Sequence, residues 1–188
     1  MNDRMPPLAA EVLSQEQKSA AAELAAGPRG GVRGPFIALL RSPELMRRLQ
    51  KVGEYLRYQS ALERRVGEFA TLIVARRLTQ QFEWQVHYPL AIEAGLAKET
   101  ADALARGSRP RAMRDDEAAV YDFCSELLQV HGVTEDTYRE AVARLGERGV
   151  VDLVGLVGYF ITVSLVLNVA HTPAGLHSGV VPLEPFPS

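Results

Sequence analysis

The sequence has 188 residues, which is enough for one folded domain with a substantial core. Its composition, 47% hydrophobic and 23% charged, is that of an ordinary soluble globular protein, and a net charge of -2 provides no basic footprint for nucleic acid. We therefore expect no nucleic-acid binding. The single cysteine, Cys124, excludes an intramolecular disulfide and a cysteine metal cluster, which fits a cytoplasmic protein.

Residues 1–33 are predicted to form an N-terminal extension with one short helix. Ser14 and Gln17 have the spacing of a capping box, which indicates that a helix begins there. The stretch "GPRGGVRGP" then ends it, because so many glycines and prolines cannot continue a helix. The first residues carry prolines and charges instead of the apolar core of a secretory signal, so we expect no export.

Residues 34–172 are predicted to form a helical domain that begins with an amphipathic helix. Ser42 is the expected N-cap and Pro43 the first helical residue, an arrangement that helix starts favour. The apolar stripe expected on this helix consists of Leu45, Leu49, Val52 and Leu56.

Two further helices are predicted over residues 62–78 and 81–94. The short connection "TQQ" between them favours an antiparallel hairpin. Gly95 follows as a C-terminal glycine of the second helix. The hairpin is therefore the expected centre of the domain.

The second half of the chain predicts four more helices. The first is closed by Gly107 and the second, which has an acidic first turn, by Gly132. A third runs from a cap at Thr134 to Leu145, and two glycines separate it from a very apolar helix starting near Asp152. Because no convincing strand pattern is present, the predicted class is all-α.

The apolar run Leu153 to Leu167 is shorter than the roughly 20 residues that span a bilayer, so we expect no membrane insertion. It is apolar around most of its circumference, which favours burial at an interface between subunits. Residues 173–188 form a proline-rich arm, for which wrapping around a neighbouring subunit and mobility both remain open.

Four polar residues interrupt the apolar pattern of the hairpin. Gln80, Glu83 and His87 are three, four and seven residues apart, so they project from one side of the second helix. Glu68 and His87 each lie about ten residues from the turn near Leu78, roughly 15 Å along antiparallel helices. This register allows the two side chains to touch.

A carboxylate beside an imidazole raises the pKa of the histidine and orients it for proton transfer near neutral pH. Glu83 then provides a second acid or base. The alternative, a solvated glutamate and histidine pair on a helix surface, stays open at this point. A metal site is not expected, because Glu83 and His87 have no third ligand at convincing spacing.

The segment "LERRVGEFATLIVARRLTQQFEWQVHYPLAIEAGL", with its "EWQVH" and the following "AKET", resembles the carboxymuconolactone decarboxylase family, whose fold is shared with the peroxidase alkylhydroperoxidase D. The resemblance covers Gly34 to about Thr172. It implies an alkylhydroperoxidase D-like helical bundle built around an antiparallel hairpin, which assembles as a homo-oligomer, either a trimer or a hexamer.

The peroxidase branch of this family carries a glutamate, a CxxC pair and a histidine, which fall on Glu68, Gln80, Glu83 and His87. Both cysteines are absent here. Glutamine and glutamate supply neither the attacking thiolate nor a disulfide partner. Cys124 lies on another predicted helix and has no second cysteine, so an antioxidant peroxidase is disfavoured.

The decarboxylase branch lacks the CxxC pair and resembles this chain better. It implies loss of carbon dioxide from a small carboxylated lactone or organic acid, without a cofactor. By this resemblance, His87 and Glu83 transfer protons and Glu68 orients His87. An arginine should hold a substrate carboxylate, and Arg76 and Arg77 are the closest in sequence.

Gln80 and Trp84 are further candidates for the substrate side of the site. For Trp84, the only tryptophan, packing in the core or an interface is the favoured interpretation over substrate stacking. A third class also stays open, a non-catalytic oligomeric protein that binds a small molecule.

Overall fold

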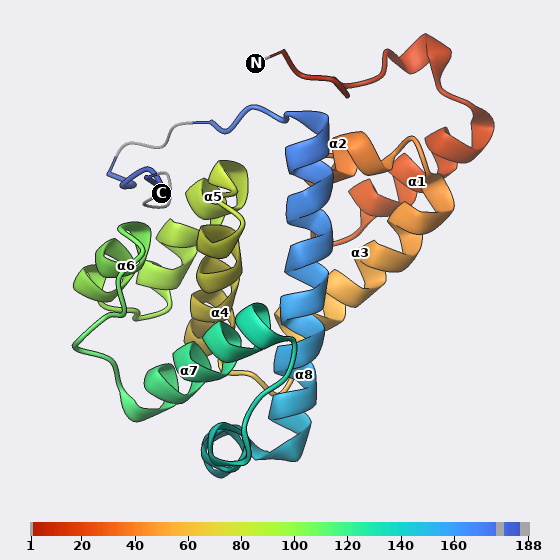
Figure 1. The fold of residues 1–188 in the computed structure, drawn as a ribbon. Helices are drawn as coiled ribbons and strands as arrows, with labels where there is room; N and C mark the ends of the chain where they lie inside the picture. Colours follow the sequence, from red (N-terminus) through yellow and green to blue (C-terminus); the bar gives the residue numbers. More distant parts are fainter. Residues whose placement is uncertain (1, 176–178, 185–188) are drawn as a thin grey trace.

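Eight α-helices and one short 3-10 helix form the part of the chain that this computed structural model describes, residues 2–175 and 179–184 (Figure 1). No strand occurs within those ranges, which confirms the all-α class. In chain order the elements are a 3-10 helix at Ala10–Val12, α1 Gln15–Ala26, α2 Pro35–Leu39, α3 Pro43–Tyr58, α4 Arg64–Arg77, α5 Gln81–Glu93, α6 Lys98–Ala105, α7 Asp115–Val130 and α8 Glu135–Ala170.

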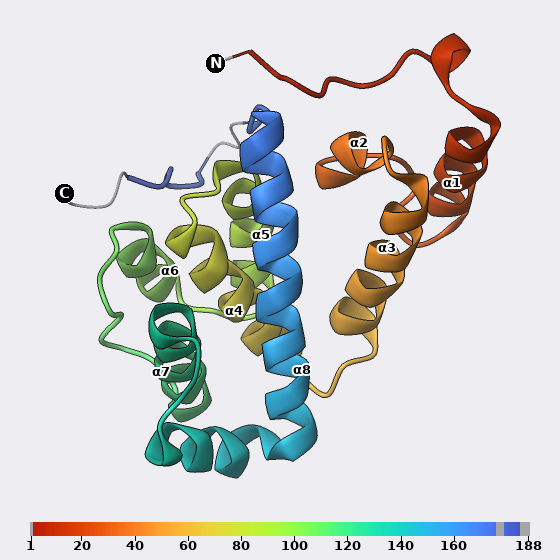
Figure 2. The same ribbon diagram turned by 45° about the vertical axis from the view of Figure 1, so that its right-hand side comes forward.

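The long helix α8 separates two groups of helices. Figure 2 shows α4 to α7 on one side of it and α1 to α3 on the other. Helix α4 packs against α5, α7 and α8, and nearly all its side chains are consequently buried. The fully buried large side chains include Phe69 of α4, Trp84 of α5, Phe123 of α7 and Leu153 of α8. The predicted α4–α5 hairpin is therefore the centre of the core.

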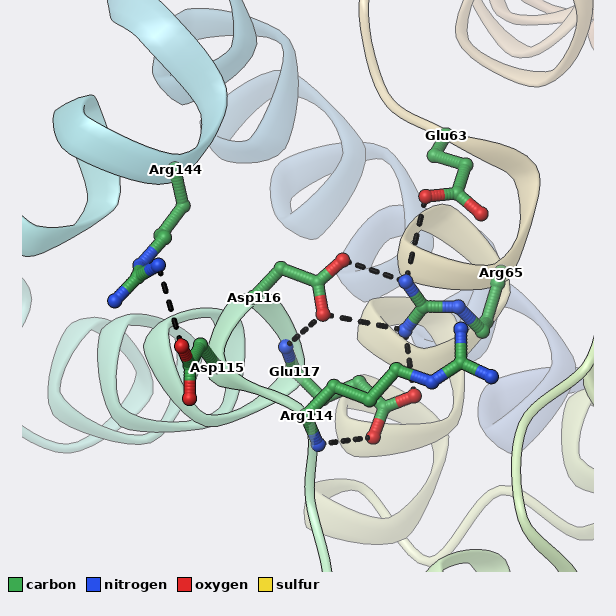
Figure 3. Close-up of polar contacts among 7 residues, drawn as sticks. All are labelled: Glu63, Arg65, Arg114, Asp115, Asp116, Glu117 and Arg144. Carbon is green, nitrogen blue, oxygen red and sulfur yellow. Dashed lines mark hydrogen bonds and ion pairs between the residues drawn. The ribbon is translucent and has the colours of Figure 1, made fainter.

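A buried arginine connects α4 to the beginning of α7. Arg65 is 3% exposed and donates to Asp116 and Glu117, each at 2.5 Å, with Glu63 at 3.3 Å (Figure 3). Glu117 also accepts a hydrogen bond from the backbone nitrogen of Arg114, at the N-cap of α7. Burial of a charge is costly unless it is paired, and here both signs are present and hydrogen-bonded.

The helix ends mostly follow the predicted signals. Ser14 and Gln17 form both hydrogen bonds of the capping box. Gly95 and Gly107 follow α5 and α6 with positive φ angles of 98° and 74°. At the end of α7 the prediction was wrong by one residue, because His131, and not Gly132, adopts the left-handed conformation, with φ of 64°.

The apolar stripe predicted for α3 was wrong at two positions. Leu45 and Val52 are 47% and 45% exposed, whereas Met46, Gly53 and Leu56 are buried. The buried face is shifted because α1, α2 and α8 all contact this helix. Ser42 precedes α3 as predicted, but its side chain makes no capping hydrogen bond.

Helix α8 consists of two helical segments that meet at a sharp kink at Gly146, where the backbone is not helical, with φ of 70° and ψ of 166° (Figure 2). The predicted break at Gly146 is confirmed. The predicted start of the second segment near Asp152 was wrong, because Gly149 is accommodated inside the helix.

By length and composition alone, α8 could cross a membrane, and half of its most apolar window is buried inside the fold. In this structure it is a packed helix of the bundle, in contact with α2, α3, α4 and α7. Its remaining side leaves Val151, Val154, Leu165 and Val169 exposed.

Both terminal segments contact the bundle. Helix α1 packs on α3, and Ala20 and Leu24 belong to a small apolar cluster of their own with α2 and α3. Residues 179–184 lie along α4 and α5 of the same chain, where Val181 accepts a hydrogen bond from Trp84 at 2.7 Å. The predicted arm also includes residues 176–178 and 185–188, which lie outside the described residues.

Candidate active site

A cavity of about 660 Å³ lies where the α4–α5 hairpin, α8, α3 and the segment before α2 meet. Its lining includes Glu68 from α4, Glu83 and His87 from α5, and Tyr159 and Phe160 from α8. A second hollow of about 410 Å³, between α1 and α3, contains none of the predicted site residues. The larger cavity is therefore the candidate active site.

The structure brings three of the predicted residues into direct contact. Nδ1 of His87 lies 2.6 Å from Oε2 of Glu68, and Nε2 lies 3.3 Å from Oε2 of Glu83. All three side chains are buried. The ring of Phe160 meets the imidazole edge to face, with 5.0 Å between centroids. The imidazole is consequently fixed between two carboxylates, and we refer to Glu68, His87 and Glu83 as the triad.

The local sequence explains how the triad forms. Glu83 and His87 are four residues apart on α5, so their side chains share one face. The short turn between α4 and α5 makes the helices antiparallel, which places Glu68 opposite His87. Both partners of the imidazole are therefore determined by helical spacing and by the length of one turn.

The two carboxylates determine the protonation state of His87. Burial disfavours the charged imidazolium, but the hydrogen bonds and negative charges of Glu68 and Glu83 outweigh this effect and raise the pKa of His87 to about 9. At neutral pH the ring is therefore protonated. Its Nδ1–H donates to Glu68, and its Nε2–H faces Glu83 across the longer distance.

Gln80 and Trp84 lie close to the triad in sequence but do not line the cavity. Gln80 is the N-cap of α5, where its Oε1 accepts from the backbone nitrogen of Phe82 at 2.6 Å. Its Nε2 donates to Asn168 of α8 at 2.8 Å. Trp84 is fully buried and donates to Val181, so both side chains hold elements together.

Neither arginine predicted to hold a substrate carboxylate lines the cavity. Arg76 is 2% exposed and donates to the backbone oxygen of Glu184. Its guanidinium also packs beside Gly107, on the side of the hairpin where α6 and residues 179–184 lie. Arg77 is exposed.

Other residues supply the positive charge of the cavity. Four arginines line it, namely Arg29, Arg33, Arg57 and Arg64. Two of these come from "GPRGGVRGP", a stretch whose glycines indicated only a break between helices. Tyr159 was also missed, because its surroundings in the sequence are those of an apolar core helix. Only the tertiary arrangement brings these segments to His87.

The environment of the single cysteine does not favour a reactive thiol. Cys124 is fully buried in α7, and burial raises the pKa of its thiol to about 12. It does not line the cavity. A reactive thiol requires the opposite environment, partly exposed and electropositive. Among the described residues, no group of three or more histidine, cysteine, aspartate or glutamate side chains is arranged to hold a metal ion.

The fold and the cavity define a class of protein, an all-helical bundle with a buried glutamate and histidine site on a helical hairpin. The model of the Carboxymuconolactone decarboxylase family matches residues 43–121, which contain α3, the hairpin and the whole triad. This region of the chain belongs to that family, which confirms the resemblance seen in the sequence. Comparison with curated protein sequences finds no significant match.

Proposed function

We propose that this protein is a cofactor-independent decarboxylase that acts on a small carboxylated lactone or a related organic acid. The observation that carries the proposal is the buried imidazolium of His87, held between Glu68 and Glu83 at the wall of a cavity of about 660 Å³. Such a cavity is of the size that encloses a small molecule. The family of residues 43–121 supports the same reaction class.

The chemistry requires one bond to break and one proton to be delivered. The bond between the substrate carbon and its carboxylate breaks, carbon dioxide leaves, and the electron pair stays on the carbon, where a conjugated lactone carbonyl delocalises it. The Nε2–H of His87 then protonates this carbon. The neutral imidazole regains a proton from water, which completes the cycle.

Each carboxylate of the triad has a separate role in this scheme. Glu68 accepts the Nδ1–H at 2.6 Å and so fixes the orientation of the ring. Glu83, at 3.3 Å from Nε2, stabilises the imidazolium through a longer contact that leaves this N–H available to a substrate. Glu83 also lies beside Nε2, the atom to which the proton from water returns.

The test is release of carbon dioxide from γ-carboxymuconolactone by the purified protein. We expect the His87→Gln and Glu83→Gln variants to lose turnover, by about 10²- to 10⁴-fold for His87. His131→Gln is the matched control, because His131 lies at the end of α7 outside the cavity. Circular dichroism of each variant verifies that the helices remain formed.

Either of two results would count against the proposal. Turnover that is unchanged in His87→Gln would remove the proton-transfer role. Absence of turnover by the wild-type protein would exclude this lactone, and binding without turnover would favour the non-catalytic binding protein.

A thiol peroxidase would require Cys124, and the burial of this cysteine argues against that class.

A further inference from the structure

We infer that Arg29 and Tyr159 form the binding site for a second carboxylate of the substrate, the one retained in the product. This inference rests on the proposed function in one respect, which is that the bound carboxylate is taken to belong to the substrate of the decarboxylation. Arg29 precedes α2 and Tyr159 lies on α8, so both residues are outside the region matched by the family. Both line the cavity that contains the triad.

Arg29 differs from the other three arginines of the cavity. Arg33, Arg57 and Arg64 are exposed, whereas Arg29 is partly buried. Arg64 pairs with Glu93 at 3.0 Å, while no described carboxylate forms an ion pair with Arg29. A shielded guanidinium without an anionic partner has a strong electrostatic preference for an anion.

The surroundings of Arg29 fix its guanidinium in place. Its Cζ lies 4.6 Å from the centroid of the Phe36 ring, and its Nη2 donates to the hydroxyl of Tyr159 at 3.4 Å. Its Nε is buried and finds no acceptor among the described residues. The side chain is thus held by an aromatic face and a neutral hydroxyl, with hydrogen-bonding capacity that these two contacts leave unused.

Gly53 of α3 makes room for this pair. A Cβ atom at position 53 would lie 2.3 Å from the Tyr159 hydroxyl oxygen and 2.7 Å from Nη2 of Arg29. Both distances are shorter than atoms can approach without displacement. The backbone of α3 therefore packs directly against Arg29 and Tyr159, and only glycine permits this at position 53.

A row of aromatic rings connects the pair to the triad. Tyr159 and Phe160 lie 5.3 Å apart between centroids, and Phe160 lies 5.0 Å from His87. Burial raises the pKa of Tyr159, and the opposing charges of Arg29 and Glu83 both act on this group. Because Arg29 and His87 line the same cavity, one small molecule can contact both.

This arrangement specifies a dianionic acid as the substrate class. The planar guanidinium of Arg29 suits a carboxylate, which it binds through two parallel hydrogen bonds. A second carboxylate at the His87 end lies beside the carboxylates of Glu68 and Glu83, which disfavour another anion and so favour its departure as neutral carbon dioxide. The product keeps the carboxylate at Arg29.

Binding of glutarate, a dicarboxylate without a lactone, tests the site independently of turnover. By calorimetry we expect the wild-type protein to bind glutarate about tenfold or more tightly than its monoamide. Arg29→Gln should remove this preference, whereas Arg77→Gln should change glutarate affinity less than about threefold, since Arg77 is exposed, largely screened and does not line the cavity. Equal losses in both variants, or no preference in the wild type, would overturn the inference.

Kinetics on γ-carboxymuconolactone separates the inference from the proposed function. Arg29→Gln should raise KM about tenfold or more with a smaller effect on kcat, whereas His87→Gln lowers kcat. Turnover with an unchanged KM in Arg29→Gln would support the proposed decarboxylation and contradict the carboxylate site at Arg29. A preference for glutarate that depends on Arg29, without turnover of any lactone, would support the carboxylate site and contradict the proposed decarboxylation.

Two further variants test the same site in case Arg29→Gln does not fold. Tyr159→Phe keeps the ring and removes the hydroxyl that holds the guanidinium, so we expect a smaller loss of glutarate affinity in the same direction. Arg29→Lys keeps the charge and removes the planar fork, and it should bind glutarate more weakly than the wild type. Wild-type affinity in both variants would contradict the inference.

Discussion

The imidazole of His87 holds its proton well above neutral pH because two buried carboxylates flank it. With the pKa raised to about 9, the proton-donating form is present at pH 7 and disappears as the pH rises through about 9. We expect kcat for decarboxylation to be constant between about pH 6.5 and 8 and to fall above about 9. Stopped-flow measurement of carbon dioxide release over this range checks it, and a fall centred near 6.5 would contradict it.

The same proton contributes to stability. The folded pKa of His87 lies above the value of about 6.5 expected in the unfolded chain, so protonation stabilises the fold. This contribution is fully present below about pH 6.5 and is lost as the pH rises through about 9. Its loss is therefore part of the same titration that removes the proton donor.

The two glutamates should affect His87 unequally. Glu68 lies 2.6 Å from Nδ1 and Glu83 lies 3.3 Å from Nε2, and a shorter charge-assisted hydrogen bond is the stronger one. We expect Glu68→Gln to lower the pKa of His87 more than Glu83→Gln does. Titration of the histidine ring protons by NMR measures both, with His87→Gln to assign the signal. A larger effect of Glu83→Gln would show that the Nε2 contact is the dominant one.

At the level of secondary structure, the ion cluster between α4 and α7 provides a test of what joins these helices. Arg65→Met leaves Asp116 and Glu117 without their cation, and removal of one partner from a buried ion pair costs about 3–5 kcal/mol. Urea unfolding should show this loss. The neighbouring Arg64→Gln is the matched control, because the Arg64 pair with Glu93 is exposed and contributes about 0–1 kcal/mol.

Similar losses in the two variants would mean that the Arg65 cluster gains little from its burial. The contrast is informative because the two arginines are adjacent in the sequence and start the same helix. Only their burial and the number of their partners differ.

Helical spacing and turn length were sufficient to predict the elements that form the triad. The three-residue turn and the four-residue spacing of Glu83 and His87 are local features, so the sequence pattern contains them. The stripe on α3 was misjudged because its buried face depends on which helices contact it. Leu45 and Val52 follow helical periodicity but lie on the side that α1, α2 and α8 leave open.

The arginines of the site could not be predicted in the same way. Arg29 lies more than fifty residues before His87, in the glycine-rich stretch between α1 and α2, and only the tertiary fold brings this stretch to the cavity. Arg76 and Arg77 were predicted because they are close along the chain, but Arg76 is directed toward α6 and residues 179–184, and Arg77 is exposed. Proximity in sequence was therefore a poor guide to proximity in the cavity.

For the whole molecule, the exposed apolar residues of α8 are the basis on which we predict a homo-oligomer. Val154 and Leu165 of α8 are 45% and 48% exposed, and Val151 and Val169 of the same helix are more exposed still. We expect the wild-type protein to be a trimer or hexamer of 20.6 kDa chains, and Leu165→Glu to dissociate it. Light scattering after size exclusion measures the mass. Val130→Glu on α7 is the control, since Val130 is equally apolar and 61% exposed; a monomeric wild type would contradict the prediction.

The single cysteine also makes the protein its own reporter of transient opening. Cys124 is inaccessible in α7, so iodoacetamide can modify it only in molecules whose core has opened. Each modified chain gains one adduct, which mass spectrometry counts directly. When reclosing is fast, the labelling rate follows the equilibrium population of open molecules in the absence of denaturant. Arg65→Met should therefore be alkylated faster than Arg64→Gln in native buffer.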